Sequence, residues 1–363
     1  MIALPASPHV LIPVVPGIGN ALMAVPMVRR LKAAIPSARI TILARTPAIG
    51  QVFSRLGEVD TVLPMHSGVR GRIADLRLTR SLRADVYLVP FPSNRWQYSL
   101  LAATSAAAVR VIHSYPVGHF RTLRFLPMTR VPAVPGIHDV AQNLNLLRAL
   151  DIDPGQPQSP TFPLSDAQRQ RGCELLEAAG LSAGSRPILI HAGSANTVLA
   201  QAKRWPPSLY AELIRQLLLR HGGSVGVLEG PDEAGVADQI LARTSAGARA
   251  VRLGGHLSDA AAVLAQARLY VGSDSGLAHL AAAVGTPPVT LFAPADPDRV
   301  CPFGYRHLVV RPDKACSPCF QYPWRSTRPR CLCRPPYCIE AITVDAVVRM
   351  VDRALCADAP DAP

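Results

Sequence analysis

The stretch that decides the fold runs Leu269-Tyr-Val-Gly-Ser-Asp-Ser-Gly-Leu-Ala-His-Leu-Ala-Ala-Ala-Val-Gly-Thr-Pro-Pro-Val-Thr-Leu-Phe292. Its pattern predicts a buried strand, a tight turn, a short helix of small residues and a second buried strand. Free N–H groups and the positive end of the helix dipole meet at the turn and favour a phosphate. Ser275 is placed to cap the helix, and Gly276 lets a ligand approach the backbone closely. We therefore expect an anion site at this turn.

Two polar side chains stand beside the turn. Asp274 precedes Ser275, and His279 lies four residues beyond it, one helical turn along the same face. A purely structural interpretation would have the aspartate cap the turn and the histidine fill the core. The strand, Asp-Ser-Gly turn and helix context favours a functional pair instead.

Alternating strands and helices predict an α/β fold of two Rossmann-like domains, each with a doubly wound parallel sheet. We expect them over residues 1–155 and 156–363, joined by a Pro-, Gly- and Ser-rich linker at 151–164. Further strands are expected at residues 10–15, 38–44, 61–65, 86–91, 109–114, 187–191, 224–229 and 250–253. Helices are expected at residues 21–34, 96–107, 138–150, 209–220, 233–243, 258–267 and 344–354. Two such halves would face a cleft at their strand ends, where a nucleotide-bearing donor meets an acceptor.

Charge is unevenly distributed along the 363 residues. The formal net charge is +13, and residues 1–155 carry +10 of it, with 17 Lys and Arg against 7 Asp and Glu. A basic half implies an acidic partner such as nucleic acid, an anionic membrane or a phosphorylated substrate, unless codon bias toward Arg explains it. The arginines are scattered and no recognised binding module appears, which argues against nucleic acid. The opening residues lack the features of a signal peptide and no apolar run reaches the length of a membrane span, so we expect a cytoplasmic protein.

Residues 16–20, Pro-Gly-Ile-Gly-Asn, follow the first expected strand and open a helix. A dinucleotide fingerprint would place a third glycine where Leu22 stands and an acidic residue where Arg45 ends the second strand. Binding of NAD is therefore not supported. The chain also shows neither a Walker loop nor a nucleophile elbow.

A second phosphate-binding loop is predicted after the strand at 187–191. Gly193 and Ser194 form a glycine and hydroxyl loop, and Lys203 follows shortly afterwards. Such a loop with a following cation can hold a diphosphate and neutralise charge on a leaving group. Lys203 is one of three lysines beside 35 arginines, which hints that a compact ammonium is needed, although a solvated loop cation is the simpler interpretation.

A cysteine-rich loop is expected over residues 313–338. Five cysteines fall within it, namely Cys316, Cys319, Cys331, Cys333 and Cys338. In a cytoplasmic chain such a series suggests a structural zinc or iron site or redox-labile pairs, but the spacing does not match a zinc ribbon. Reduced thiols or a disulfide that fastens the loop remain the alternatives.

Three motifs together resemble the heptosyltransferase family, glycosyltransferase family 9. They are Gly17-Ile-Gly-Asn-Ala-Leu-Met-Ala-Val-Pro26, His191-Ala-Gly-Ser through Lys203-Arg-Trp-Pro206, and Asp274-Ser-Gly-Leu-Ala-His279 through Phe292. The resemblance covers nearly the whole chain and implies a GT-B enzyme. It implies inverting transfer of a heptose from ADP-heptose to a lipopolysaccharide core or related glycan acceptor, without a cofactor.

The resemblance also assigns residues to roles. Donor-binding residues would be Gly193, Ser194, Lys203, Ser275, Gly276, Leu277 and His279, with Lys203 and Asp274 at the reacting diphosphate. Gly19, Asn20 and Arg95 in the basic first domain would hold the acidic, lipid-linked acceptor. A lipid-linked acceptor would bring the protein to the inner face of the inner membrane as a peripheral protein.

One residue departs from the family pattern. Where the family commonly carries an aspartate proposed as the catalytic base, this chain has Asn20, and an amide does not accept a proton at neutral pH. Another group could serve as base, or substrate positioning could carry most of the rate. A catalytically weak sugar-nucleotide binder and a transferase acting on a protein acceptor are the alternative hypotheses.

Overall fold

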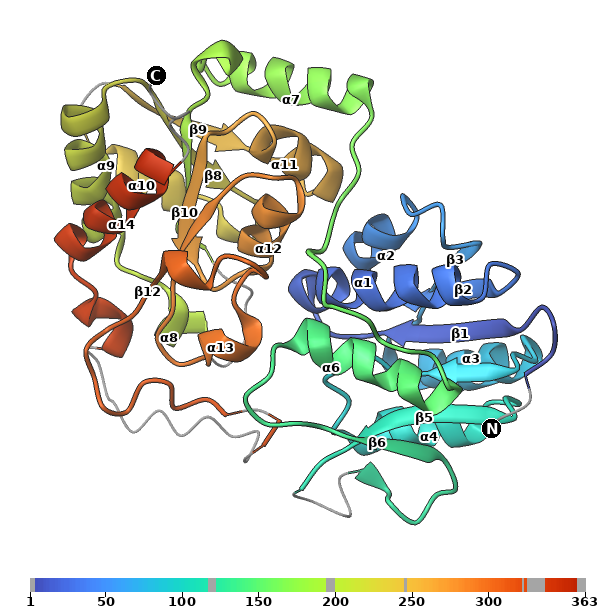
Figure 1. Cartoon of the computed structure of the whole chain (residues 1–363). Coiled ribbons are helices and arrows are strands. Elements are labelled where there is room, and N and C mark those ends of the chain that lie inside the picture. Colours follow the sequence, from blue (N-terminus) through green and yellow to red (C-terminus); the bar gives the residue numbers. More distant parts are fainter. Residues whose placement is uncertain are drawn as a thin grey trace. The chain divides into compact units, whose positions relative to one another are not determined.

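The computed structural model describes residues 4–116, 122–193, 200–244, 247–321, 323–324 and 337–357. The chain forms two compact units (Figure 1). The first unit comprises Met1–Pro160 with Tyr322–Ser326, and the second comprises Thr161–Gln321 with Thr327–Pro363. The α/β fold predicted from the sequence is confirmed in both units.

A six-stranded parallel sheet of order β3-β2-β1-β4-β5-β6 forms the centre of the first unit. Its strands are β1 His9–Val14, β2 Arg39–Ala44, β3 Thr61–Pro64, β4 Val86–Leu88, β5 Val109–Ser114 and β6 Thr129–Pro132. Its helices are α1 Ile18–Ala34, α2 Pro47–Phe53, α3 Gly68–Ser81, α4 Trp96–Thr104, α6 Asp139–Asn145 and the 3-10 helix η1 Leu146–Leu150. Because α1 packs against α2 and α6 while α3 packs against α4, the helices cover the two faces of a doubly wound sheet.

The second unit repeats this plan with the sheet order β12-β11-β10-β7-β8-β9. Its strands are β7 Ile188–His191, β8 Val225–Glu229, β9 Ala248–Arg252, β10 Leu269–Ser273, β11 Pro288–Leu291 and β12 Val309–Val310. Its helices are α7 Asp166–Ala178, α8 Ala200–Lys203, α9 Pro207–His221, α10 Val236–Leu241, α11 Leu257–Leu264, α12 Gly276–Ala283, α13 Pro297–Val300 and α14 Val344–Ala357. Short 3-10 helices complete it, η2 Ala183–Ser185, η3 Pro231–Glu233, η4 Arg306–Leu308 and η5 Cys338–Ala341.

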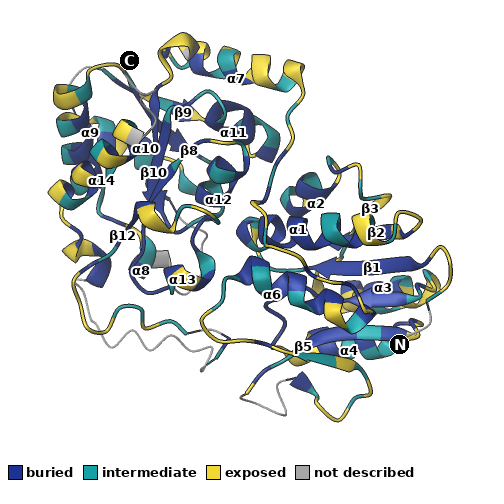
Figure 2. Ribbon diagram, in the orientation of Figure 1, coloured by how far each residue is buried: buried dark blue, intermediate teal, exposed yellow. Residues whose placement is uncertain are grey.

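Burial explains why the strands are nearly continuous apolar runs rather than alternating ones. Every residue of β1, β7, β8 and β10 is buried, as expected for parallel strands covered by helices on both faces (Figure 2). In the second unit Trp205 lies in the core beneath α9, where its indole N–H donates to the Ile342 carbonyl at 3.0 Å. No helix in the described part of the chain is long and apolar enough to cross a bilayer.

Strand β6 and helix α7 are among the elements that the sequence did not lead us to expect. Strand β6 is a four-residue edge strand whose burial does not alternate, so it left no periodic signal. Helix α7 is mostly polar, and it packs closely on α11 because Gly172 has no side chain to collide with the Ala262 carbonyl. A capping box between Ser165 and Gln168 marks the start of α7 and was the available signal.

Part of the cysteine-rich loop belongs to the first unit by its contacts. The Trp324 ring lies 6.2 Å from the Phe91 ring and 6.4 Å from the Tyr115 ring, measured between centroids. The buried Asn94 amide donates to the Pro323 carbonyl at 3.3 Å. The expected boundary at residues 155 and 156 places this whole loop in the second domain, whereas residues 322–326 belong to the first unit.

Candidate active site

The strand order of the second unit locates a ligand site. From β7 the chain proceeds to β8 and β9 on one side, whereas β10 lies on the other side of β7 and leads to β11 and β12. Ligands of such sheets bind beyond the carboxyl ends of the two strands where the order reverses. Gly193 follows β7 at this point, and Asp274 and Ser275 follow β10. The topology thus brings together two predicted loops whose residues Gly193 and Asp274 are 81 positions apart in sequence.

An ion pair joins these loops. Lys203 at the end of α8 places its Nζ atom 2.5 Å from Oδ2 of Asp274. The two side chains are only 21% and 10% exposed, so water screens the pair weakly. The structure therefore places the Lys203 ammonium beside the turn after β10, where the Asp274 carboxylate holds it.

The first turn of α12 offers its backbone N–H groups. Ser275 occupies the N-cap position in an extended conformation, but its side chain makes no capping hydrogen bond. The expected capping by the Ser275 side chain is therefore wrong; its Oγ atom lies 3.4 Å from the Tyr270 hydroxyl instead. Gly276 and Leu277 in this turn are half-buried, and His279 is buried. The uncapped amides and the dipole at the start of α12 are of the kind that favours an anion, and the Lys203–Asp274 pair lies beside them.

A histidine and a glutamate that are both largely shielded from solvent pair at the end of β7. Nε2 of His191 lies 2.7 Å from Oε2 of Glu233, and the side chains are 6% and 12% exposed. Burial raises the pKa of the Glu233 carboxyl, but the hydrogen bond from His191 and the positive charges of His191 and Arg204 bring the pKa below its ordinary value. The Glu233 carboxylate occupies the place that a Cβ atom on residue 193 would take. Position 193 therefore accepts only glycine while Glu233 pairs with His191.

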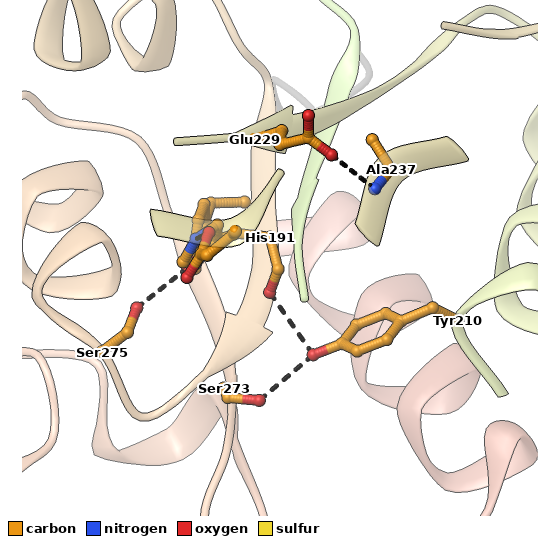
Figure 3. A network of polar contacts seen from close by, with 8 residues as sticks. His191, Tyr210, Glu229, Ala237, Ser273 and Ser275 are labelled. Carbon is orange, nitrogen blue, oxygen red and sulfur yellow. Dashed lines mark hydrogen bonds and ion pairs between the residues drawn. The ribbon is translucent and has the colours of Figure 1, made fainter. Parts of the chain in front are cut away.

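Two buried tyrosines, Tyr210 and Tyr270, contact the ends of β7 and β10, and Figure 3 shows the contacts of Tyr210 with His191 and Ser273. The Tyr210 hydroxyl lies 3.2 Å from the Ser273 Oγ atom and donates to the His191 carbonyl at 3.4 Å. The Tyr270 hydroxyl lies 3.4 Å from Nδ1 of His191. These contacts fix the relative positions of the two strand ends that carry the candidate site.

In the first unit the corresponding reversal of strand order lies between β1 and β4. Gly19 and Asn20 lie in the first turn of α1, beyond the carboxyl end of β1. Gly19 is buried, and Asn20 is half-buried without a side-chain hydrogen bond to any described residue. Arg95 is the exposed N-cap residue of α4, which follows β4. The predicted acceptor residues thus lie at neighbouring strand ends.

Some predicted residues fall outside the described part of the chain, namely Ser194, Cys331 and Cys333. Of the other cysteines in the loop, Cys316 and Cys319 are exposed, while Cys338 is buried in η5. Among the residues that the structure describes, no group of three or more His, Cys, Asp or Glu side chains could hold a metal ion.

Solved structures define the class of this fold. A glycosyl transferase family 9 protein from Veillonella parvula has a TM-score of 0.77 at 18% identity, covering 97% of this chain and 98% of its own. The Escherichia coli ADP-heptose lps heptosyltransferase II has a TM-score of 0.73 at 22% identity, covering 97% and 100%. The fold is that of the GT-B glycosyltransferases.

Sequence similarity gives the family. The Salmonella typhimurium lipopolysaccharide heptosyltransferase 2 is 28% identical over 323 residues, which cover 81% of this chain and 85% of that protein. The profile of glycosyltransferase family 9 (heptosyltransferase) matches residues 76–327. This chain belongs to glycosyltransferase family 9 and is therefore a glycosyltransferase, as the three motifs had indicated.

Proposed function

We propose that the protein transfers a heptose from ADP-heptose to a lipopolysaccharide core or related glycan acceptor, with inversion at the anomeric carbon. The observation that carries the proposal is the pairing of Lys203 with Asp274 beside the uncapped N-terminus of α12. The names of the relatives, which are lipopolysaccharide heptosyltransferases, support the choice of sugar and acceptor.

The donor diphosphate is assigned to the second unit. Its negative charge would meet the amides of Gly276 and Leu277 and draw the Lys203 ammonium partly away from Asp274. An acceptor hydroxyl oxygen attacks the anomeric carbon from the opposite face, the bond from that carbon to the diphosphate oxygen breaks, and ADP leaves with the electron pair. Lys203 and the helix amides would stabilise the charge that develops on the leaving oxygen, so the step requires no cofactor.

The acceptor hydroxyl must also lose its proton, which passes to solvent water as the new bond forms. Asn20 stands at the switch point of the first unit, but its amide is no base at neutral pH. We assign it to binding and orientation of the acceptor, and orientation then carries a larger share of the rate. The same residue favours a second candidate function, a sugar-nucleotide-binding protein of weak activity.

Peripheral contact with an anionic membrane is proposed for the first unit. On α3 the apolar side chains of Val69 and Ile73 are 74% and 47% exposed. Four exposed arginines lie on the same helix, Arg70, Arg72, Arg77 and Arg80. The one acidic residue of α3, Asp75, is buried and contacts His66 at 2.8 Å. Exposed apolar residues flanked by arginines suit an anionic lipid surface.

The position of α3 agrees with a lipid-linked acceptor. Helix α3 begins just beyond the carboxyl end of β3 and α4 just beyond β4, so the first turns of both lie at the sheet edge that also carries Asn20. Trp96 at the start of α4 is a further exposed apolar residue there. We propose that this surface places the acceptor site near the inner face of the inner membrane. A structural zinc or iron in the cysteine-rich loop stays a separate hypothesis, tested by elemental analysis of the purified protein.

Release of ADP from ADP-heptose tests the proposed function. We expect release that depends on heptose-deficient lipopolysaccharide. Binding of ADP-heptose without release, even with that acceptor, would favour the weak binder. No binding of ADP-heptose would refute the donor assignment.

A further inference from the structure

Four side chains form a continuous line of polar contacts that ends in the anion-binding turn. Glu233 Oε2 lies 2.7 Å from His191 Nε2, and His191 Nδ1 lies 3.4 Å from the Tyr270 hydroxyl. The same hydroxyl lies 3.4 Å from Ser275 Oγ. The line crosses from the loop after β8, over the end of β7, to the turn after β10. None of these contacts is required by the sheet itself.

The number of protons on each group determines which way the hydrogen bonds run. The Glu233 carboxylate only accepts, so Nε2 of His191 carries a proton and donates it. Burial raises the pKa of Tyr270, which therefore stays a phenol with one O–H. A phenol at this position can donate to His191 or to Ser275, but not to both.

With His191 neutral, its Nδ1 atom is an acceptor and the Tyr270 O–H donates to it. The Tyr270 oxygen then accepts from the Ser275 hydroxyl, whose proton points into the protein. In this state Ser275 has no proton to offer to a ligand in the turn.

With His191 protonated, Nδ1 becomes a donor and the direction of the line reverses. The imidazolium donates to the Tyr270 oxygen, and the Tyr270 O–H donates to Ser275 Oγ. The Ser275 proton is released to donate outward, to a phosphate oxygen placed at the N-terminus of α12. The imidazolium also forms an ion pair with Glu233.

We propose that His191, acting through Tyr270, couples uptake of one proton from solvent to binding of the donor diphosphate at Ser275. The inference rests on the proposed function, because it takes the diphosphate to occupy this turn. Tyr270 is in this role a positioning residue, since it touches Ser275 and His191 but not the substrate.

Other charged groups around His191 are held by partners of their own. Asp274 pairs with Lys203. On the neighbouring strand β8, Glu229 accepts from the Ala237 amide at 2.8 Å and pairs with Arg252. Arg204 acts on Glu233 through its charge, and Tyr210 donates to the His191 carbonyl and not to the imidazole. Of the described contacts to the imidazole, only the one with Tyr270 leads on to the turn.

Calorimetry with ADP-heptose, without acceptor, tests the coupling. Both phosphates of ADP-heptose are esters that do not titrate near neutral pH, so buffers of different ionisation enthalpy report protons taken up by the protein. We expect the wild type to take up protons on binding, and its affinity to fall as the pH rises, by up to about tenfold per pH unit at full coupling. Tyr270→Phe should bind more weakly at low pH and show neither proton uptake nor this pH dependence.

Tyr210→Phe is the matched control, because it removes a buried hydroxyl that contacts the same strand end but not the imidazole. It should keep the wild-type proton uptake, and thermal unfolding of both variants checks that they fold. Equal proton uptake by wild type and Tyr270→Phe would overturn the coupling while leaving the donor assignment intact. Binding of ADP-heptose by the wild type without proton uptake would do the same, whereas absence of binding would refute the proposed function itself.

Discussion

Replacing Lys203 by methionine tests the donor site most directly. The change keeps an apolar stem but removes the ammonium, which lies 2.5 Å from Asp274 in a pair that is 21% and 10% exposed. Loss of one preorganised group that stabilises a developing charge costs about 100- to 1000-fold in rate, or about 2.7–4 kcal/mol. The remaining Asp274 carboxylate would then repel the diphosphate, so we expect kcat/KM for ADP-heptose to fall by at least this factor.

The assay is acceptor-dependent ADP release at several ADP-heptose concentrations. Lys314→Met is the matched control, because Lys314 is an exposed lysine in the same unit and should be replaceable without effect. Wild-type kcat/KM in folded Lys203→Met would refute the assignment of this lysine to the diphosphate.

Adding Asp274→Asn to Lys203→Met separates the effect of losing the ammonium from the effect of leaving the Asp274 carboxylate unpaired. In Lys203→Met the carboxylate is left buried beside the bound anion, and removing its charge should relieve the repulsion. The double variant should therefore bind ADP about tenfold more tightly than Lys203→Met, which is within the range of coupling between contacting residues. Additive losses would show that Asp274 and the diphosphate do not share Lys203.

Three further predictions concern the first unit. Asn20→Asp should raise kcat at neutral pH by about 100-fold or more if the acceptor proton limits the rate, measured as ADP release; an unchanged kcat would mean that no base acts at this position. Val69→Asp should weaken sedimentation with phosphatidylglycerol vesicles, whereas Leu219→Asp, at an equally exposed apolar site of the second unit, should not. Burial lowers the pKa of His113 to about 3. The unfolded chain therefore binds a proton there below about pH 6.5, and from pH 7.5 to 4.5 wild type should lose about 2–3 kcal/mol more unfolding free energy than His113→Gln. Urea titrations that show equal losses would contradict this.

The sequence was sufficient for the architecture and for the local parts of the site. Strand, turn and helix follow one another directly in the stretch around Asp274, so their pattern could be interpreted without knowing the rest of the fold. Lys203 could be singled out because lysine is rare in this chain. Its ion pair with Asp274 could not be predicted, because it depends on β7 and β10 being neighbours in the sheet.

The polar line behind the turn was missed for the same reason. His191, Glu233 and Tyr270 come from three different segments, and each looks like an ordinary residue at the end of a strand or in a loop. The available hint was Gly272, where a side chain would collide with the Tyr270 hydroxyl and the His191 carbonyl. A glycine in a buried strand often marks such a close approach. The Ser275 side chain was expected to cap α12, but the nearby Tyr270 hydroxyl competes for it.

The packing of Trp324 against Phe91 and Tyr115 affects how the protein can be divided into fragments. The first unit is not a continuous piece of chain. Trp324, which packs on its aromatic cluster of Phe91 and Tyr115, follows the unit's last helix by more than 160 positions. A fragment ending at Pro160 would leave the faces of Phe91 and Tyr115 and the amide of Asn94 without these partners. During synthesis the first unit can therefore complete its packing only after most of the second unit has emerged, when Trp324 becomes available to Phe91 and Tyr115.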